Sequence, residues 1–135
     1  MIVKTALICL ALNIYHESRN QSVAGQVAVG ETTMNRVAHK HYPNNVCDVV
    51  YQKGKKSCAF SWTCDDKPDK PYEKSAWEKS LGLAEMILGD DYDLTVVGDK
   101  VTHYHTYRVN PYWAKAKNLE KVRKIGDHIF YRWNL

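Results

Sequence analysis

A single glutamate, Glu17, is the residue whose position in the sequence points most directly to chemistry. Apolar residues recur every three or four positions ahead of it, at Val3, Leu7, Leu10 and Ile14. This spacing places them on one face of a helix, and Glu17 takes the next position on that face. Burial disfavours the charged form of a carboxyl group and therefore raises its pKa. A carboxylic acid still protonated near neutral pH is what a general acid for glycosidic-bond cleavage requires.

Glu31 is the nearest candidate for a second carboxylate, because it follows Glu17 by fourteen residues. The usual glycoside hydrolase uses two carboxylates, and Glu31 is the acid that would activate a water molecule in such a pair. Simpler interpretations stay open for both residues. Glu31 could lie on a helix surface or pair with Arg36, and Glu17 could end a frayed helix and bind Arg19 or Arg36.

A weaker pattern adds Thr32 to the candidate substrate-binding residues. Some phage muramidases carry an Asp or Cys nine residues after their catalytic Glu and a Thr six residues further on. Thr32 stands at the second of these offsets from Glu17, but Gln26 occupies the first. The pattern is therefore incomplete, and the argument for a catalytic site does not depend on it.

The elements that must position these residues are mainly helical. Hydrophobic periodicity predicts a first helix over residues 2–17 and a fourth over 73–88 that ends at Gly89. A second helix is expected over residues 23–38 behind Ser22 as its N-cap, with core positions at Val23, Val27, Met34 and Val37. A short third helix is expected over residues 42–51, and residues 52–71 are expected to be irregular around an aromatic centre.

The C-terminal half changes character and predicts a small sheet. Residues 101–107 alternate as a strand does, with Thr102, Tyr104 and Thr106 on one face and His103, His105 and Tyr107 on the other. Residues 128–133 form a final strand. The sequence thus predicts an α+β fold, mainly helical, as one domain over residues 1–135.

Composition excludes several classes of function. The net charge of +4 favours a polyanionic partner. The basic run at residues 115–124 lacks any nucleic-acid-binding signature, so it predicts a solvated face and no nucleic-acid partner. His103 and His105 could bind a metal with a third ligand from elsewhere, but the sequence has no His-Glu-x-x-His or comparable pair on a helix, so we expect no metal and no cofactor. No stretch is long and apolar enough to be an integral membrane segment.

The four cysteines leave the redox compartment open. Cys9 is expected to be a small core residue of the first helix. One disulfide among Cys47, Cys58 and Cys64 is conceivable, but the sequence favours free thiols. The apolar run after Lys4 has a weak basic region and no clear cleavage site, so we interpret it as part of the fold rather than as a signal peptide.

Seven ordered blocks of the sequence span about residues 8–132: Ala11-Leu12-Asn13-Ile14-Tyr15-His16-Glu17-Ser18-Arg19, Gly25-Gln26-Val27-Ala28-Val29-Gly30, Met34-Asn35-Arg36-Val37, Cys58-Ala59-Phe60-Ser61-Trp62-Thr63, Thr102-His103-Tyr104-His105, Val109-Asn110-Pro111-Tyr112-Trp113-Ala114 and Ile125-Gly126-Asp127-His128-Ile129-Phe130-Tyr131. Together these blocks resemble the cell-wall hydrolases related to the spore cortex-lytic enzymes. Members of that group commonly read Tyr-Gly-Glu-Ala-Arg-Gly-Glu at the first block, whereas here His16 replaces the Gly, Ser18 replaces the Ala, and Gln21 stands near the second Glu.

The resemblance implies a lysozyme-like domain that acts on peptidoglycan as a lytic transglycosylase with Glu17 as its single catalytic acid. It also implies that Tyr104 and Trp113 line a glycan cleft, although plain core packing is an equal alternative. Phe60, Ser61 and Trp62 are expected either in a cleft wall or in the interior. Asn35 and Arg36 are expected to fix the second helix against the first, and Arg36 near Glu17 would lower the pKa of the acid.

Three other activities stay open at this point: a hydrolytic muramidase, an N-acetylmuramoyl-L-alanine amidase and a non-catalytic peptidoglycan-binding module. The resemblance and the apparent lack of a signal peptide are typical of a phage endolysin. Such a protein is made in the cytoplasm and reaches the periplasmic peptidoglycan after the inner membrane is breached. We expect it to act as a monomer on peptidoglycan glycan strands.

Overall fold

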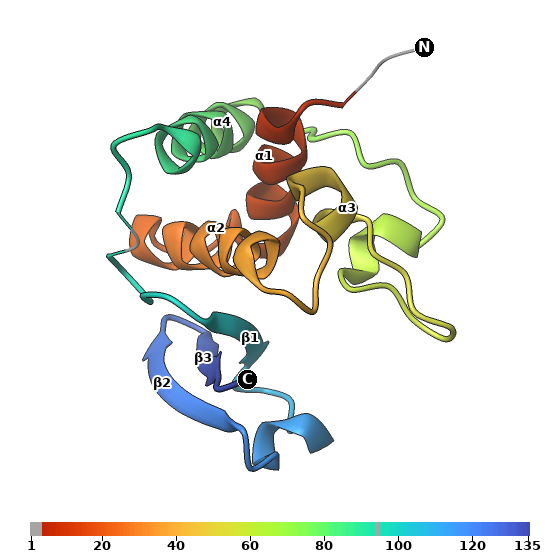
Figure 1. Cartoon of the computed structure of the whole chain (residues 1–135). Coiled ribbons are helices and arrows are strands. Elements are labelled where there is room, and N and C mark those ends of the chain that lie inside the picture. The colour runs from red at the N-terminus through yellow and green to blue at the C-terminus, as the bar shows by residue number, and fades with distance from the viewer. Residues whose placement is uncertain (1–3, 94) are drawn as a thin grey trace.

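The computed structural model, which describes residues 4–93 and 95–135, confirms a mainly helical α+β fold with a small sheet in the C-terminal half. Four helices form one lobe, and a three-stranded antiparallel sheet lies against the side of that lobe formed by α2 (Figure 1). The helices are α1 (Ala6–Ser18), α2 (Val23–Ala38), α3 (Val46–Val50) and α4 (Lys74–Leu88), and the strands are β1 (Val101–Thr106), β2 (Leu119–Ile125) and β3 (His128–Trp133).

Helix α1 runs through the centre of the helical lobe and ends one residue after Glu17. It begins at Ala6 rather than at residue 2, because the Thr5 side chain accepts a hydrogen bond from the Ile8 N–H and caps the first turn. Leu10 and Ile14 are completely buried, as the hydrophobic stripe predicts. Val3, the first residue of that stripe, lies outside the described residues.

Helix α2 has the predicted bounds, and Ser22 caps it by accepting a hydrogen bond from the Gly25 N–H. Gly30 marks close packing: a Cβ at this position would lie 2.6 Å from a methyl group of Ile87 in α4 and 3.1 Å from one of Ile14 in α1. The prediction that Val23 is a core residue is wrong, because this side chain is 51% exposed. Val23 stands in the first turn of α2, before the buried segment that starts at Gly25.

Strand β2 is the element that sequence analysis missed. The strand order is β1-β3-β2, so β2 is an edge strand whose register with β3 shifts between Lys121 and Arg123. Its Lys and Arg side chains are exposed, and only Ile125 is buried. The basic run at residues 115–124 is a solvated face, as predicted, but most of it also forms strand β2. An edge strand tolerates such charges because one side of it stays in water.

The cysteines form two disulfides, which corrects the expectation of free thiols. Cys9 is buried as predicted, but it is bonded to Cys47 and so links α1 to α3. Cys58 and Cys64 are bonded to each other around the short 3₁₀ helix η1 (Ser61–Cys64). The first bond joins positions 38 apart. Closing a loop of that length lowers the conformational entropy of the unfolded chain, which stabilises the folded state by about 4 kcal/mol.

The segment between α3 and α4 is irregular, as predicted, and its aromatic centre is packed. Phe60 and Trp62 are 3% and 8% exposed and belong to the hydrophobic core of the helical lobe. The segment is thereby fixed against α1, close to the helix end that carries Glu17. None of the described helices combines the length and the hydropathy needed to cross a membrane.

Candidate active site

Glu17 lies where the helical lobe meets the sheet. It occupies the last turn of α1, and its side chain is only partly exposed. The hydroxyl of Tyr104, on strand β1, donates a hydrogen bond to Glu17 Oε1. Tyr104 in turn packs against Phe130 and the edge of His128 on β3. The structure thus brings together two of the residues that the resemblance selected, from opposite lobes of the molecule.

The surroundings of Glu17 keep its carboxyl group protonated to a higher pH than usual. Burial raises the pKa of Glu17, while the Tyr104 hydrogen bond and the positive charge of Arg36 oppose this effect without cancelling it. Arg36 therefore does not abolish the acid role. The pKa of Tyr104 is itself raised well above its ordinary value, mainly by burial, so its hydroxyl stays a hydrogen-bond donor.

Asn35 and Arg36 join α2 to the sheet, and not to α1 as expected. The Asn35 side-chain amide donates to the carbonyl oxygens of Gly98 and Val101, at 2.8 and 3.0 Å. Arg36 Nε donates to the Thr102 carbonyl oxygen at 2.8 Å. Because these carbonyls stand at the start of β1, the two side chains help to set the position of Tyr104 two residues later.

Glu31 has a structural position rather than a place beside Glu17. It is completely buried, so it neither lies on the helix surface nor, among the described residues, pairs with Arg36. Its carboxylate accepts hydrogen bonds from the Tyr92 hydroxyl and from the N–H groups of Thr95, Val96 and Val97, the last at 2.9 Å. These bonds anchor the segment that leads into β1.

Thr32 is also completely buried, and its hydroxyl donates to the Ala28 carbonyl oxygen at 2.9 Å. The structure therefore gives neither Glu31 nor Thr32 a surface that a bound glycan could contact. The expectation that Glu31 and Thr32 take part in the site is therefore wrong, because sequence spacing alone does not show which face of α2 is covered by the rest of the chain.

Phe60, Ser61 and Trp62 have three different environments. Phe60 is buried, with the Arg36 guanidinium 5.2 Å from its ring centre. Ser61 is exposed. Trp62 is largely buried, but its indole stacks on the His16 imidazole at a centroid distance of 4.5 Å. Packing thus explains Phe60, Ser61 lies at the surface, and Trp62 belongs to the core but lines a pocket beside the end of α1.

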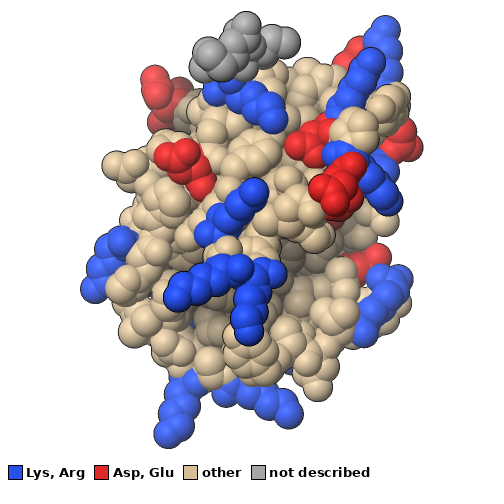
Figure 2. Space-filling model, turned by 90° about the vertical axis from the view of Figure 1, so that its right-hand side faces the viewer, with Lys and Arg blue, Asp and Glu red and all other residues tan. Residues whose placement is uncertain are grey.

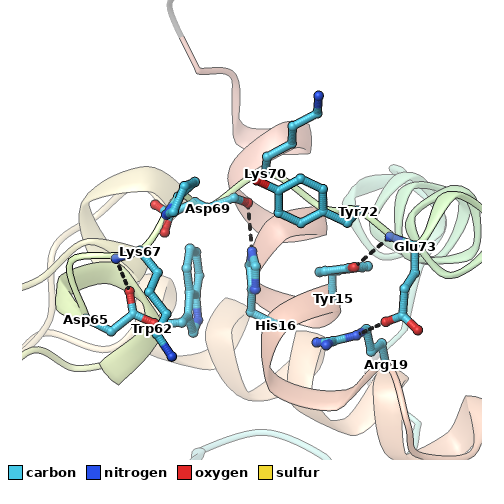
Figure 3. A pocket seen from close by; sticks show the side chains of 11 residues that line it. Tyr15, His16, Arg19, Trp62, Asp65, Lys67, Asp69, Lys70, Tyr72 and Glu73 are labelled. Carbon is cyan, nitrogen blue, oxygen red and sulfur yellow. Dashed lines mark hydrogen bonds and ion pairs between the residues drawn. The ribbon is translucent and has the colours of Figure 1, made fainter.

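A pocket of about 330 Å³ opens beside this stacked pair, between α1 and residues 65–73 (Figure 3). His16 Nε2 donates to the Asp69 carbonyl oxygen at 2.8 Å, and the Glu73 N–H donates to the Tyr15 hydroxyl at 3.0 Å. Arg19 forms an ion pair with the Glu73 carboxylate. Glu17 itself does not line this pocket, because its side chain faces Tyr104. Sequence analysis noted the dense Lys and Asp of this segment but did not predict a pocket.

Trp113 lies across the sheet from the Glu17 site. It belongs to the 3₁₀ helix η2 (Tyr112–Lys115) and packs against His103 and His105, with centroid distances of 5.1 and 5.5 Å. These two histidines occupy the face of β1 opposite to Tyr104. Tyr104 and Trp113 are therefore not parts of one wall around Glu17, although both are partly accessible.

The histidines of β1 act as hydrogen-bonding residues of the sheet. His105 Nε2 lies 2.8 Å from the Tyr131 hydroxyl, and His103 Nδ1 lies 2.9 Å from the Thr102 hydroxyl. Burial and the nearby Arg36 lower the pKa of His103 to about 4, so it is neutral at physiological pH. Within residues 4–93 and 95–135, no group of three or more His, Cys, Asp or Glu is arranged to hold a metal ion.

Charge is divided unevenly between the two lobes. Residues 95–135 contain eight Lys and Arg but only three Asp and Glu, so the positive net charge comes from the C-terminal half. On the face shown in Figure 2, Lys and Arg predominate in the lower part, where the sheet lies, and Asp and Glu gather in the upper part. The sheet is thus the part of the molecule that would attract a polyanion.

Comparison with known proteins agrees with this architecture. The chain is similar to the catalytic domain of the Bacillus cereus SleB protein in its crystal structure, with a TM-score of 0.63 and 25% identity over 96% of this chain and 91% of that one. It is also 26% identical over 125 residues to two spore cortex-lytic enzymes of Bacillus cereus. The alignment covers 90% of this chain and 42% of each curated relative.

The family pattern of the Cell Wall Hydrolase family matches residues 20–131, which is most of the chain. Glu17 lies three residues before the matched range, so its proposed role depends on the geometry of the site and on the resemblance of its sequence block. The range includes Tyr104, Trp113, strands β1 and β2, and β3 as far as Tyr131. Together with the likeness of the folds, this match shows that the chain belongs to the Cell Wall Hydrolase family.

Proposed function

We propose that this protein cleaves the glycan strands of peptidoglycan between N-acetylmuramic acid and N-acetylglucosamine, as a lytic transglycosylase with Glu17 as its acid and base. The observation that carries the proposal is a partly exposed carboxyl group whose pKa is raised by burial, held by a neutral phenol. Family membership and the similarity to spore cortex-lytic enzymes support the choice of substrate.

The raised pKa keeps Glu17 protonated to a higher pH than an ordinary glutamate, and in that form it can donate to the glycosidic oxygen as that bond breaks. The carboxylate that results accepts the Tyr104 hydrogen bond and is stabilised by the charge of Arg36. It then removes the proton from the C6 hydroxyl of the muramoyl residue. That oxygen attacks C1 and closes a 1,6-anhydro ring, so the sugar supplies its own nucleophile and Glu17 regains its proton.

A one-carboxylate mechanism matches the structure better than a two-carboxylate one. Glu31, the candidate for activating water, is completely buried and already accepts hydrogen bonds from four donor residues. The groups that shift the pKa of Glu17 through hydrogen bonding or charge are Tyr104 and Arg36, neither of which has a carboxyl group. These observations favour a transglycosylase over a muramidase.

Mass spectrometry of the soluble products tests the proposal. Purified peptidoglycan is treated with the wild type, with Glu17→Gln and with Glu78→Gln, which changes an exposed glutamate of α4. We expect 1,6-anhydro-muramic acid ends from the wild type and the Glu78→Gln control, and none from Glu17→Gln. Reducing muramic acid ends, heavier by one water, would instead indicate a muramidase. Free peptide stems with intact glycan would indicate an amidase.

The two disulfides support action outside the reducing cytoplasm, because such bonds persist mainly in oxidising compartments. We therefore propose that the protein works on wall peptidoglycan after crossing or breaching the inner membrane. A role in phage-induced lysis rests on the sequence resemblance alone and stays a prediction. Action as a monomer also stays a prediction.

A further inference from the structure

We propose that the pocket between α1 and residues 65–73 binds the peptide stem of the muramoyl residue whose glycosidic bond is cleaved. This inference rests on the proposed glycan cleavage and adds a second binding site to it. It assigns a function to the charge-dense segment before α4, which the mechanism at Glu17 does not use. The ligand is a short peptide that carries both carboxylate and ammonium groups.

The position of the pocket relative to Glu17 suits a stem. His16 lines the pocket and directly precedes Glu17 in α1, so their Cα atoms are about 3.8 Å apart. The stem begins at the lactyl group on C3 of the same sugar ring whose glycosidic oxygen Glu17 would protonate. Three extended residues span about 10 Å, which is enough to lead from the ring around His16 into the pocket.

The charges of the pocket match a ligand with both signs. Its wall holds the exposed Asp65, Lys67 and Lys70 and the half-buried Asp69, and none of these four forms an ion pair within the described part of the chain. A stem offers carboxylates from its glutamate and terminal residue and an ammonium group from its diamino acid. In the sheet region, by contrast, Glu120 and Asp127 already form ion pairs with arginines.

The pocket is held in shape before any ligand arrives. The hydrogen bonds of His16 and Tyr15 and the Arg19–Glu73 ion pair fasten residues 69–73 to α1. The Cys58–Cys64 disulfide restrains the turn that carries Trp62, the aromatic wall of the pocket. A preformed site loses little conformational freedom on binding. Figure 3 shows Trp62, His16 and Tyr15 side by side along this wall, with Asp65 and Lys67 at one end.

The test compares two substrates that differ only in their stems. One is purified peptidoglycan, and the other is the same glycan after an amidase has removed the peptides. Release of anhydro ends gives kcat and KM for the wild type, for Lys67→Met, for Asp65→Asn and for Lys79→Met. Lys79 is an exposed lysine of α4 that does not line the pocket, so Lys79→Met is the matched control.

We expect the wild type and Lys79→Met to cleave stem-bearing strands with a higher kcat/KM than bare strands. Each of the two pocket variants should raise KM for stem-bearing strands roughly fivefold, the effect of losing one exposed charge contact, and leave kinetics on bare strands unchanged. Equal wild-type kinetics on both substrates would overturn the inference, as would pocket variants that behave like Lys79→Met. If the wild type forms anhydro ends from neither substrate, the proposed function itself fails.

Discussion

Glu17 and Glu31 stand on neighbouring helices of the same lobe, and the structure uses the two carboxylates in opposite ways. Glu31 is completely buried and accepts hydrogen bonds from a tyrosine hydroxyl and three backbone N–H groups. Glu17 remains partly exposed and, within the described residues, accepts one side-chain hydrogen bond, from Tyr104. The number of donors around each carboxyl group therefore separates a structural anchor from a candidate acid.

The difference has a simple physical basis. Hydrogen bonds to a carboxylate compensate for the water it loses on burial. Several such bonds also hold together the elements that carry the carboxylate and the donors. A carboxyl group with few donors is left under-compensated, and its protonated form is favoured. Glu17 has few hydrogen-bond donors and a partly exposed side chain, whereas Glu31 has several donors and is completely buried. The following experiments test whether Glu17 is catalytic and Glu31 is structural.

The largest expected effect is the loss of turnover in Glu17→Gln. A general acid contributes roughly a hundredfold to ten-thousandfold in rate, so we expect a fall of at least about a hundredfold in kcat. The fold should be retained, because the Gln carbonyl oxygen can still accept the Tyr104 hydrogen bond. Release of soluble glycan fragments measures the rate, and a circular dichroism spectrum checks the fold. Full activity in this variant would remove the catalytic role of Glu17.

The opposite result is expected for Glu31→Gln, which should affect stability and not turnover. Replacing the carboxylate by an amide weakens charge-assisted hydrogen bonds in a buried site, so the free energy of unfolding should fall by about 3 kcal/mol. Urea denaturation measures this change, with Glu85→Gln on the exposed side of α4 as the control. Activity per folded molecule should be preserved. Its loss, with stability unchanged, would place Glu31 in the catalytic machinery.

A smaller effect is expected for Tyr104→Phe, in the pH dependence of the reaction. The Tyr104 hydrogen bond lowers the pKa of Glu17, so removing it should raise that pKa further. Because the acid must be protonated to act, the alkaline limb of the kcat/KM profile should move to higher pH. The profile of Tyr131→Phe, which removes a hydroxyl bonded to His105, serves as the control and should not move. A shift to lower pH in Tyr104→Phe would contradict the proposed environment of Glu17.

The smallest effect is a stability difference that depends on pH. The folded-state pKa of Glu17 is raised above its ordinary value of 4.5, so folding is favoured while the group is protonated and loses that advantage as pH rises through the folded pKa. Glu17→Gln does not titrate, and it should therefore gain stability relative to the wild type as the pH rises. Thermal unfolding at about pH 4 and about pH 8 measures the difference. A variant less stable than the wild type only at the higher pH would show that Glu17 is stabilised as a carboxylate.

Local patterns in the sequence located all four helices, but the third helix is shorter than expected, over Val46–Val50 rather than residues 42–51. The bounds of α2 and its Ser22 cap follow from periodicity and from the chemistry of a helix start, which act over a few residues. Strand β2 was missed because an edge strand that is charged on its exposed side shows little alternation. The disulfides were missed because their pairing depends on how α1 and α3 approach each other.

The candidate site was predicted only in part, because its residues come together through contacts between distant parts of the chain. Tyr104 donates a hydrogen bond to the Glu17 carboxyl group, and Trp62 stacks on the neighbouring His16. Glu31, Thr32 and Phe60, in contrast, are buried in the interior. The pocket beside His16 was not predicted at all, since its two walls belong to segments about fifty residues apart.

By itself, the sequence determined that a carboxyl group would follow the apolar stripe of the first helix, because helical spacing is a local property. It also carried the ordered blocks that resemble cell-wall hydrolases. Tertiary contacts were needed to bring Tyr104, 87 positions away, to Glu17, and to bring the hydrogen-bond donors of Tyr92, Thr95, Val96 and Val97 to Glu31. Burial and hydrogen-bond donors set the chemistry of a carboxylate, and both come from parts of the chain that are distant in sequence.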